Sequence, residues 1–369
     1  MLESKPSCWF AYKGLSVDST GNLNPCGHST YKFGKFTDYN SLNVDRTNAI
    51  KDFDQHVPKG CISCTNREVR NEQSRRLYHY DWFSQQVNFD IEFLDIDIGN
   101  LCNLKCRMCN PGQSSSWIID RQLKDKVNFT LDDFDNNKIL DNIDGDMIKF
   151  VSSLDFLRYV IIKGGEPFMH PRFFEFIECI PNKHNVTLQI ITNGTHRLTK
   201  DEKKLFAKFD KLNIFFSVES DGEMYQYIRG GKFTFEESLY NWKSYKTFPN
   251  ANEIGWIYTA NIYGIYNFDS LQSKIEHAID LGHQVLDPMY LNPLITPLHI
   301  KQKILETTNY SHWKKYFATS AVDLFSISID KQYELLHNLY SYTTTLDNIR
   351  GQHLLDVEPR FEWIYEYKN

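Results

Sequence analysis

The chain has 369 residues, a formal net charge of −6 and 41% hydrophobic residues. This length suggests two domains, or one large domain with an appendage, and the apolar content is ample for a core. The negative charge argues against an extended nucleic-acid groove. Residues 1–10 carry no apolar signal segment, and no apolar run approaches the length of a membrane span. We therefore expect a cytoplasmic protein, in which disulfides are unusual, so its eight cysteines point to metal.

The first ninety residues contain two pairs of cysteines. Residues 15–26 read as a β-hairpin with Gly21 at its turn, and a helix is expected over residues 68–83. Cys8 and Cys26 flank the hairpin. Cys61 and Cys64 form a C-x2-C knuckle, a spacing typical of metal-binding sites. Four thiolates make a complete ligand set, and this pattern leaves zinc and an iron–sulfur cluster equally open.

An apolar strand over residues 91–98 leads into a loop with three closely spaced cysteines. These are Cys102, Cys106 and Cys109, with the spacing C-x3-C-x2-C. Three thiolates on one short loop can hold three irons of a cubane cluster, which leaves the fourth iron open for a ligand. The alternative is a structural zinc, for which His170 or Cys179 would have to supply the fourth ligand.

Strands and helices alternate from residue 92 onward, which is typical of a parallel sheet built from βα units. Six strands are predicted, at residues 92–98, 157–163, 186–192, 212–218, 253–260 and 284–290. Helices are predicted at residues 113–125, 171–180, 199–209, 234–247, 267–281 and 298–317. Residues 318–369 are rich in aromatic side chains and are predicted to be mostly helical.

Polar and glycine-rich motifs follow these strands, at the ends where barrel enzymes place their chemistry. The strand 157–163 is followed by Gly164-Gly165-Glu166-Pro167, in which the glycines let a ligand approach the backbone and Glu166 offers a carboxylate to an ammonium group. The other candidates are Asn193, Ser217, Glu219 and Arg229, with Asn261, Tyr290 and Asn292 as weaker ones. Taken singly, each motif also fits an ordinary turn or a surface side chain.

The cysteine loop and the Gly-Gly-Glu-Pro turn resemble motifs of the radical S-adenosylmethionine (SAM) enzymes. The resemblance implies a 4Fe-4S cluster on the three cysteines, whose open iron chelates the amino and carboxylate groups of SAM. It also implies a partial (β/α)6 barrel, similar in outline to a TIM barrel.

The same resemblance implies roles for the candidate residues at the strand ends. Gly164, Gly165 and Glu166 would hold the amino group of SAM, and Arg229 would contact its carboxylate. Ser217 or Glu219 would reach the ribose or the carboxylate of SAM, and Asn193 would bind cofactor or substrate. Met108 stands where many members carry an aromatic residue, and a thioether can also pack beside an adenine.

The amino-terminal cysteine pairs resemble the auxiliary-cluster module of the SPASM and twitch type, which binds a second 4Fe-4S cluster. In most relatives this module follows the barrel, whereas here it precedes it. The predicted division is residues 1–88 for the cysteine-rich auxiliary domain, 89–300 for the barrel and 301–369 for a helical carboxyl-terminal extension.

The expected fold class is therefore α/β, and the expected activity is that of a radical SAM enzyme. It would cleave SAM, form a 5′-deoxyadenosyl radical and abstract hydrogen from a substrate, which by family likeness is a peptide or protein side chain. An oxidoreductase-type or peptide-modifying reaction would need an electron donor such as flavodoxin or ferredoxin. The alternatives are a nucleoside or sugar modifier, and a non-catalytic iron–sulfur or zinc-binding module.

Overall fold

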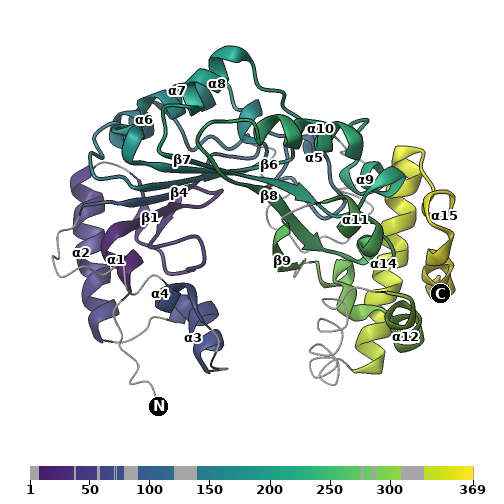
Figure 1. Cartoon of the computed structure of the whole chain (residues 1–369). Coiled ribbons are helices and arrows are strands. Elements are labelled where there is room, and N and C mark those ends of the chain that lie inside the picture. Colours follow the sequence, from purple (N-terminus) through teal and green to yellow (C-terminus); the bar gives the residue numbers. More distant parts are fainter. Residues whose placement is uncertain are drawn as a thin grey trace.

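The computed structural model describes residues 8–36, 39–55, 59–69, 71, 73–78, 90–119, 139–275, 278–284, 288–308 and 328–368. These residues form one curved sheet of nine strands in the order β3-β2-β1-β4-β5-β6-β7-β8-β9. The sheet is arched, with the amino-terminal helices at one end of the arch and the carboxyl-terminal helices at the other (Figure 1).

Six neighbouring strands of the sheet run parallel, from β4 to β9. Their bounds are β4 Phe93–Asp97, β5 Tyr159–Lys163, β6 Thr187–Thr192, β7 Lys211–Val218, β8 Ala251–Ala260 and β9 Ala278–Gln284. The first five agree with the predicted strands. The sixth prediction, over residues 284–290, is wrong, because β9 ends at Gln284. Pro288 caps a 3-10 turn, and a proline has no N–H to donate to a neighbouring strand.

The amino-terminal strands extend this same sheet. They are β1 Gly14–Val17, β2 Asn22–Asn24 and β3 Gly34–Lys35. The predicted hairpin is confirmed: β1 pairs antiparallel with β2, and Gly21 takes a φ of 78° at the turn. On its other edge β1 runs parallel to β4, with Leu15 opposite Leu94. The division of the chain at residues 88 and 300 stays a prediction.

Helices cover the outer, convex face of the sheet and both of its flanks (Figure 1). The α-helices are α1 Trp9–Lys13, α2 Tyr39–Gln55, α3 Ile62–Val69, α4 Arg75–Tyr78, α5 Ser116–Ile119, α6 Gly145–Val151, α7 Phe173–Cys179, α8 Lys200–Phe206, α9 Gly222–Arg229, α10 Phe235–Tyr245, α11 Phe268–Lys274, α12 Leu298–Thr307, α14 Ile329–Arg350 and α15 Leu354–Val357. A long 3-10 segment, η10 Pro359–Tyr367, ends the chain. No helix in the described part of the chain is long and apolar enough to cross a membrane.

The predicted helices agree with the structure in part. Short helices α3 and α4 replace the single helix expected over residues 68–83, of which 79–83 lie outside the described residues. Helix α9 was not predicted, and the helix expected over 267–281 stops at Lys274. The carboxyl-terminal part of the predicted helices 113–125 and 298–317 also lies outside the described residues. The α/β fold class and the helical carboxyl-terminal extension are confirmed.

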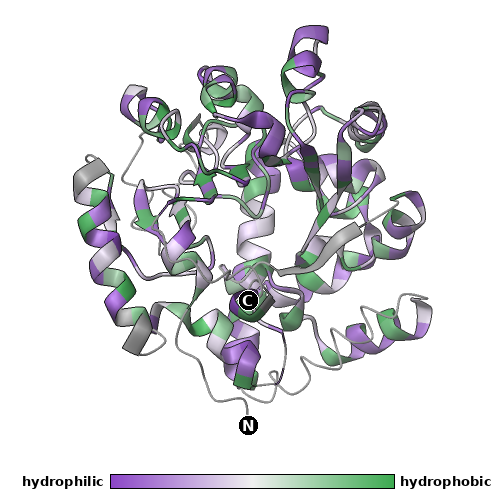
Figure 2. Ribbon diagram, turned by 60° about the vertical axis from the view of Figure 1, so that its left-hand side comes forward, coloured by the Kyte–Doolittle hydropathy of each residue, from purple (hydrophilic) through white to green (hydrophobic). Residues whose placement is uncertain are grey.

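The core lies between the sheet and its outer helices. Alternate residues of β4 and β5, such as Leu94 and Ile162, are fully buried there, and Phe176 of α7 packs into the same cluster. Figure 2 shows that the surrounding helices carry both hydrophobic and hydrophilic residues, as helices with one face on a core do. The intervening residues of β4 and β5 lie on the inner, concave face of the sheet, and among them are Asp95, Asp97 and Lys163.

Replacing Ile162 by Ala tests this core. The side chain of Ile162 is fully buried, so we expect the free energy of unfolding to fall by about 2–5 kcal/mol in urea denaturation. Ile329→Ala removes the same atoms from a residue that is 85% exposed at the start of α14, and should leave the stability nearly unchanged. Equal losses in the two variants would contradict the assignment of the core.

Candidate cluster and cofactor site

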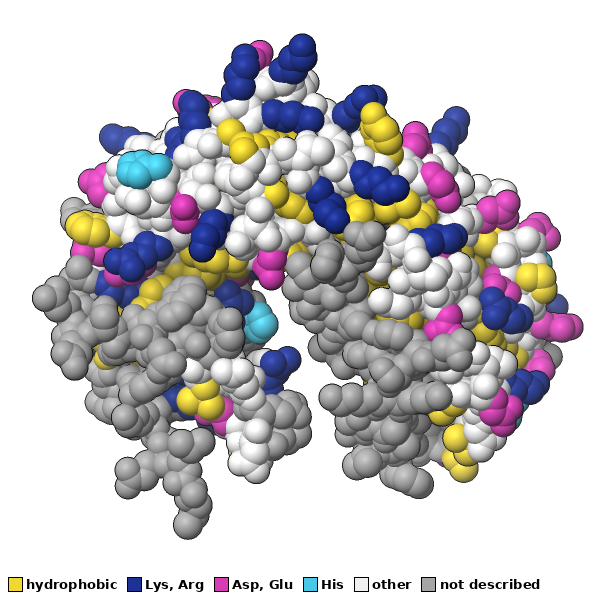
Figure 3. All heavy atoms as spheres, viewed as in Figure 1, with side chains coloured by type: hydrophobic (Ala, Val, Ile, Leu, Met, Phe, Trp, Pro, Cys, Tyr) yellow, Lys and Arg dark blue, Asp and Glu magenta, His cyan; other side chains and the backbone are white. Residues whose placement is uncertain are grey.

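A cavity of about 620 Å³ opens at the carboxyl ends of the parallel strands. Cys102, Cys106 and Cys109 line it together, as the cysteine spacing predicts. Figure 3 shows the molecule hollowed between its amino-terminal and carboxyl-terminal parts. Ligand sites of small molecules have volumes of about 300–1,000 Å³, so this cavity is large enough for a cofactor.

The backbone of the cysteine loop is held in place by the end of α9. The N–H of Lys105 donates to the carbonyl of Arg229 at 3.3 Å, and the N–H of Arg107 donates to that of Ile228 at 2.7 Å. Within the loop, the N–H of Leu104 points at the sulfur of Cys102 at 3.4 Å. These bonds orient the three thiols toward one space.

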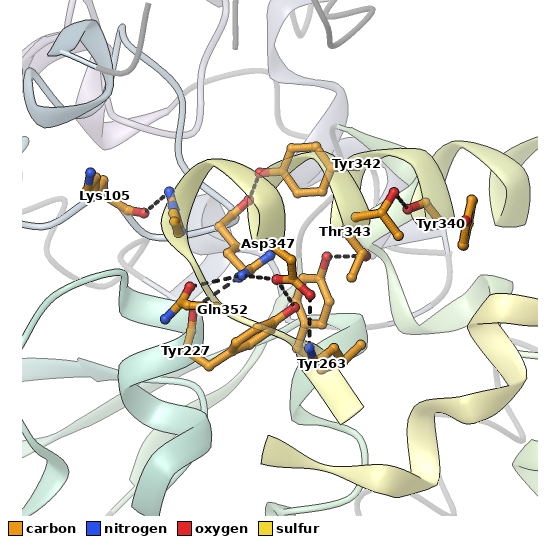
Figure 4. A network of polar contacts seen from close by, with 12 residues as sticks. Lys105, Tyr227, Tyr263, Tyr340, Tyr342, Thr343, Asp347 and Gln352 are labelled. Atoms are coloured by element: carbon orange, nitrogen blue, oxygen red, sulfur yellow. Dashed lines mark hydrogen bonds and ion pairs between the residues drawn. The ribbon is translucent and has the colours of Figure 1, made fainter. Parts of the chain in front are cut away.

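Arg107, between two of the cysteines, is fully buried and anchors the loop to helix α14. Figure 4 labels its partners Tyr227, Asp347 and Gln352. Its Nη2 lies 2.6 Å from the carboxylate of Asp347, and its guanidinium stacks on the ring of Tyr227 with 3.6 Å to the centroid. The hydroxyl of Tyr342 donates to the backbone carbonyl of Arg107. Helix α14, for which the sequence suggested no chemistry, therefore forms the back wall of the cysteine loop.

Glycines form the opposite wall of the loop. Gly99 and Gly164 take φ angles of 130° and 136°, which side chains rarely allow. A Cβ on Gly165 would lie 2.5 Å from the carbonyl oxygen of Leu101, inside the backbone of the cysteine loop. The Gly-Gly pair thus permits the strand β5 and the cysteine loop to touch, and its backbone lines the cavity.

Glu166 is oriented differently from its glycine neighbours. Its carboxylate is buried and accepts hydrogen bonds from the hydroxyl of Thr192 at 2.8 Å and the N–H of Asn193 at 2.6 Å, which ties β5 to the end of β6. Burial raises the pKa of Glu166 to about 7. The carboxylate does not line the cavity. The expected contact of this side chain with an ammonium group stays a prediction, and the structure gives the carboxylate these other partners.

The other predicted cofactor residues gather around the three cysteines. They are Met108, Gly164, Gly165, Asn193, Ser217, Glu219 and Arg229, and all of them line the cavity. Their proposed roles toward a cofactor stay predictions. The amide of Asn193 donates to Asn103 at 2.9 Å and approaches the sulfur of Cys102 at 3.7 Å. Glu219 and Arg229 form a buried ion pair with a shortest N–O distance of 2.7 Å, so Arg229 is not a solvated surface residue.

Several weaker candidates lie away from the cavity. Asn261 and Asn292 cap 3-10 turns by accepting from the N–H groups of Tyr263 and Leu294, and Tyr290 packs on Tyr342. His170 is buried against Asp141, and Cys179 ends α7, so neither is placed to complete a metal site with the three cysteines.

The cavity also contains residues that the sequence analysis missed. Asp97, Lys163 and Thr259 line it from the ends of β4, β5 and β8. A signal was present, since Asp95, Asp97 and Lys163 interrupt otherwise apolar strands at alternate positions.

The four amino-terminal cysteines come together in a second pocket. Cys8, Cys26, Cys61 and Cys64 line it, with Arg75 and Arg76 beside them. The knuckle that carries Cys61 and Cys64 is the start of α3. Burial raises the pKa of the Cys8 thiol to about 12 and that of Cys26 to about 11.

Four thiolates can serve a tetrahedral zinc or a cubane cluster, so the auxiliary cluster at the amino-terminal cysteines stays a prediction.

Asp347→Asn tests the anchor of the cysteine loop. Removing one charge from a buried ion pair leaves the other uncompensated, so we expect the free energy of unfolding to fall by about 3–5 kcal/mol. Asp356→Asn, on α15, is the control, because that side chain is 85% exposed and its loss should cost little. Chemical denaturation followed by circular dichroism measures both, and a negligible loss for Asp347→Asn would show that α14 does not secure the loop.

None of the curated proteins compared with the chain matches it. Among solved structures, anSMEcpe with bound AdoMet and Cp18Cys peptide is 14% identical, with 71% of this chain and 62% of that chain covered and a TM-score of 0.37. SuiB of Streptococcus suis bound to the precursor peptide SuiA is 16% identical, with 61% and 41% covered and a TM-score of 0.27.

TYW1 with a lysine-pyruvate adduct is 16% identical, with 60% of this chain and 72% of that chain covered and a TM-score of 0.30. The chain spans less than two thirds of the length of anSMEcpe and SuiB, and with TM-scores this low none of the three overlaps establishes a shared function. Residues 96–269, which include all three cysteines of the loop, match the model of the radical SAM superfamily. The chain therefore contains a radical SAM domain over residues 96–269.

Proposed function

We propose that this protein cleaves SAM reductively at a 4Fe-4S cluster held by Cys102, Cys106 and Cys109, and that it modifies a peptide or protein side chain. These three cysteines would hold the cluster, which would supply the electron that splits SAM into methionine and a 5′-deoxyadenosyl radical able to abstract a hydrogen atom from the substrate. One observation carries the proposal: three cysteine thiols of a radical SAM domain line one cavity that is large enough for a cofactor.

The residues around the thiols suit the polar groups of SAM. The backbone of Gly164 and Gly165 lines the cavity where an ammonium group would bind, while the carboxylate of Glu166 behind them ties β5 to β6. Arg229 binds Glu219 through Nε and Nη2, which leaves Nη1 to donate to a carboxylate. The ion pair with Glu219 also fixes the plane of the guanidinium before a ligand arrives.

Two further residues suit the remaining parts of the cofactor. The Met108 thioether lines the cavity beside the cysteines and can pack on an adenine ring. Ser217, at the end of β7, offers a hydroxyl to a ribose. All of these groups stand on strand ends, on the end of α9 or on the anchored loop, so little reorganisation is needed on binding.

The second part of the proposal is an auxiliary 4Fe-4S cluster on Cys8, Cys26, Cys61 and Cys64. The four cysteines share one pocket and together make a complete ligand set for a cubane. With four protein ligands such a cluster has no open iron for SAM, so its roles are electron transfer, substrate positioning or stabilisation of the amino-terminal part.

A peptide or protein side chain is the substrate class that the sequence resemblance implies, and the cavity at the strand ends is where it would react. Reductive cleavage also needs an external electron, for which we propose a flavodoxin or ferredoxin as donor.

Replacing Cys102, Cys106 and Cys109 together by Ala tests the catalytic site. The variant loses every ligand of the proposed cluster, so anaerobically reconstituted protein with SAM and a strong reductant should form no 5′-deoxyadenosine, measured by chromatography. Cys179→Ala is the matched control, because this cysteine lies outside both sites, and it should keep full activity. Formation of 5′-deoxyadenosine by the triple variant would refute the assignment.

Metal analysis of protein purified without air tests the auxiliary site. Two cubanes hold about eight irons, and replacement of Cys8, Cys26, Cys61 and Cys64 by Ala should leave about four. That variant should still cleave SAM when no substrate is present. Stoichiometric zinc with about four irons in the unmodified protein would exclude the auxiliary cluster and leave the proposal for the catalytic site untouched.

A further inference from the structure

The inner face of strands β4 and β5 carries charge where a barrel lumen would otherwise be apolar. Asp97 lies opposite Lys163 in the register of the two strands, and Asp95 is two residues earlier on the same face. Their neighbours Leu94 and Ile96 are fully buried on the outer face. The three charged residues therefore form a row along the lumen, and its last member, Asp97, lines the cavity.

The cations of the cavity are already matched by other acids. The ammonium of Lys163 lies 2.5 Å from the buried carboxylate of Asp95, and Arg229 is bound by Glu219. Asp97 has no such partner among the residues that the structure describes. Its Oδ1 accepts from the N–H of Gly99 at 3.1 Å, and the residue lines the cavity.

The surroundings of Asp97 are short of positive charge. Burial raises the pKa of Asp97 to about 6, and the negative charges of Asp95 and Asp18 oppose the favourable effects of Gly99 and Lys163. The carboxylate is thus largely ionised at neutral pH and would gain from a cation that binds beside it.

The position of this row of charged residues suggests which molecule would carry the cation. Gly27, next to the auxiliary-site residue Cys26, touches the row at its inner end: a Cβ there would lie 2.9 Å from the ammonium of Lys163. At the other end, Asp97 adjoins Gly99 and Gly164 beside the cysteine loop. A ligand group held by Asp97 would lie in the lumen between the two cysteine sites, where the proposed function requires the substrate.

We propose that Asp97 is a specificity-determining residue that binds a positively charged group of the substrate, an ammonium or guanidinium on a peptide side chain. This inference rests on the proposed function, because it names the substrate class for the same cavity. Asp97 acts by holding the cation within reach of the radical. The ion pair of Asp95 with Lys163 leaves Asp97 to bind the cation of the substrate.

Randomised hexapeptide pools with one fixed central residue test the proposal. The fixed residue is Lys, Arg, norleucine or Glu, and the retention of each pool on immobilised, reconstituted protein with SAM is measured. Norleucine matches the length of Lys without its charge. A charge-assisted hydrogen bond corresponds to roughly a ten- to hundred-fold preference, so we expect the Lys and Arg pools to be retained at least about tenfold more than the norleucine pool.

Three variants locate the preference. Asp97→Asn should abolish it, Asp97→Glu should retain part of it, and Asp201→Asn, at an exposed carboxylate on α8, should leave it unchanged. Equal retention of all pools by the unmodified protein, or an unchanged preference in Asp97→Asn, would overturn the proposal. If Asp97→Asn weakened SAM binding by the same factor, Asp97 would belong to the cofactor site and the proposal would again fail.

The same preparations separate this proposal from the proposed function. Formation of 5′-deoxyadenosine without peptide depends on the cysteine loop and on the residues proposed to bind SAM, and it needs no charge preference for a peptide. If the unmodified protein made none while the charge preference persisted, the radical chemistry would be refuted and the cation site retained. Normal SAM cleavage without a charge preference would refute only the role of Asp97.

Discussion

The candidate site depends on one buried cation, Arg107, which lies between two of the three cysteines of the loop. Burying a guanidinium is costly unless charge and hydrogen bonds compensate it. Asp347 supplies the charge, the carbonyl of Tyr227 accepts from Nε at 3.0 Å, and Gln352 accepts from Nη2 at 3.1 Å. The cysteine loop is thereby fastened to α9 and α14, and it cannot shift without breaking this set of contacts.

Two walls of different physical character define the space in front of the thiols. On the side of α14 the wall is built from ion pairs and aromatic rings, whereas on the side of β5 it is built from glycine backbone. Glu166 stiffens the second wall from behind, because its buried carboxylate binds the end of β6. The space in front of the thiols is therefore bordered by glycine backbone on one side, and side chains such as Asn193 and Arg229 complete its lining.

Much of the barrel could be predicted because its strands are short apolar runs with turn residues between them. The position of β9 was not predicted, because apolar residues recur at helical spacing through Phe268, Leu271 and Ile275, and this pattern does not reveal where α11 ends and β9 begins. The sequence motifs predicted that the three cysteines would lie in one site with Gly164, Asn193 and Arg229, and all of these residues line the cavity. The partners of Arg107 were not, since Tyr227 and Asp347 lie 120 and 240 residues further along the chain. The orientation of Glu166 was also beyond a local pattern, because it depends on the end of β6.

The most direct measurement of the central claim is electron paramagnetic resonance of the reduced cluster with and without SAM, in protein whose four amino-terminal cysteines are replaced so that only one cluster remains. If the three-cysteine cluster leaves an iron open to SAM, addition of the cofactor must shift the g-values, and SAM labelled with ¹³C at its carboxylate must show hyperfine coupling to the cluster. A spectrum unchanged by SAM would contradict the account.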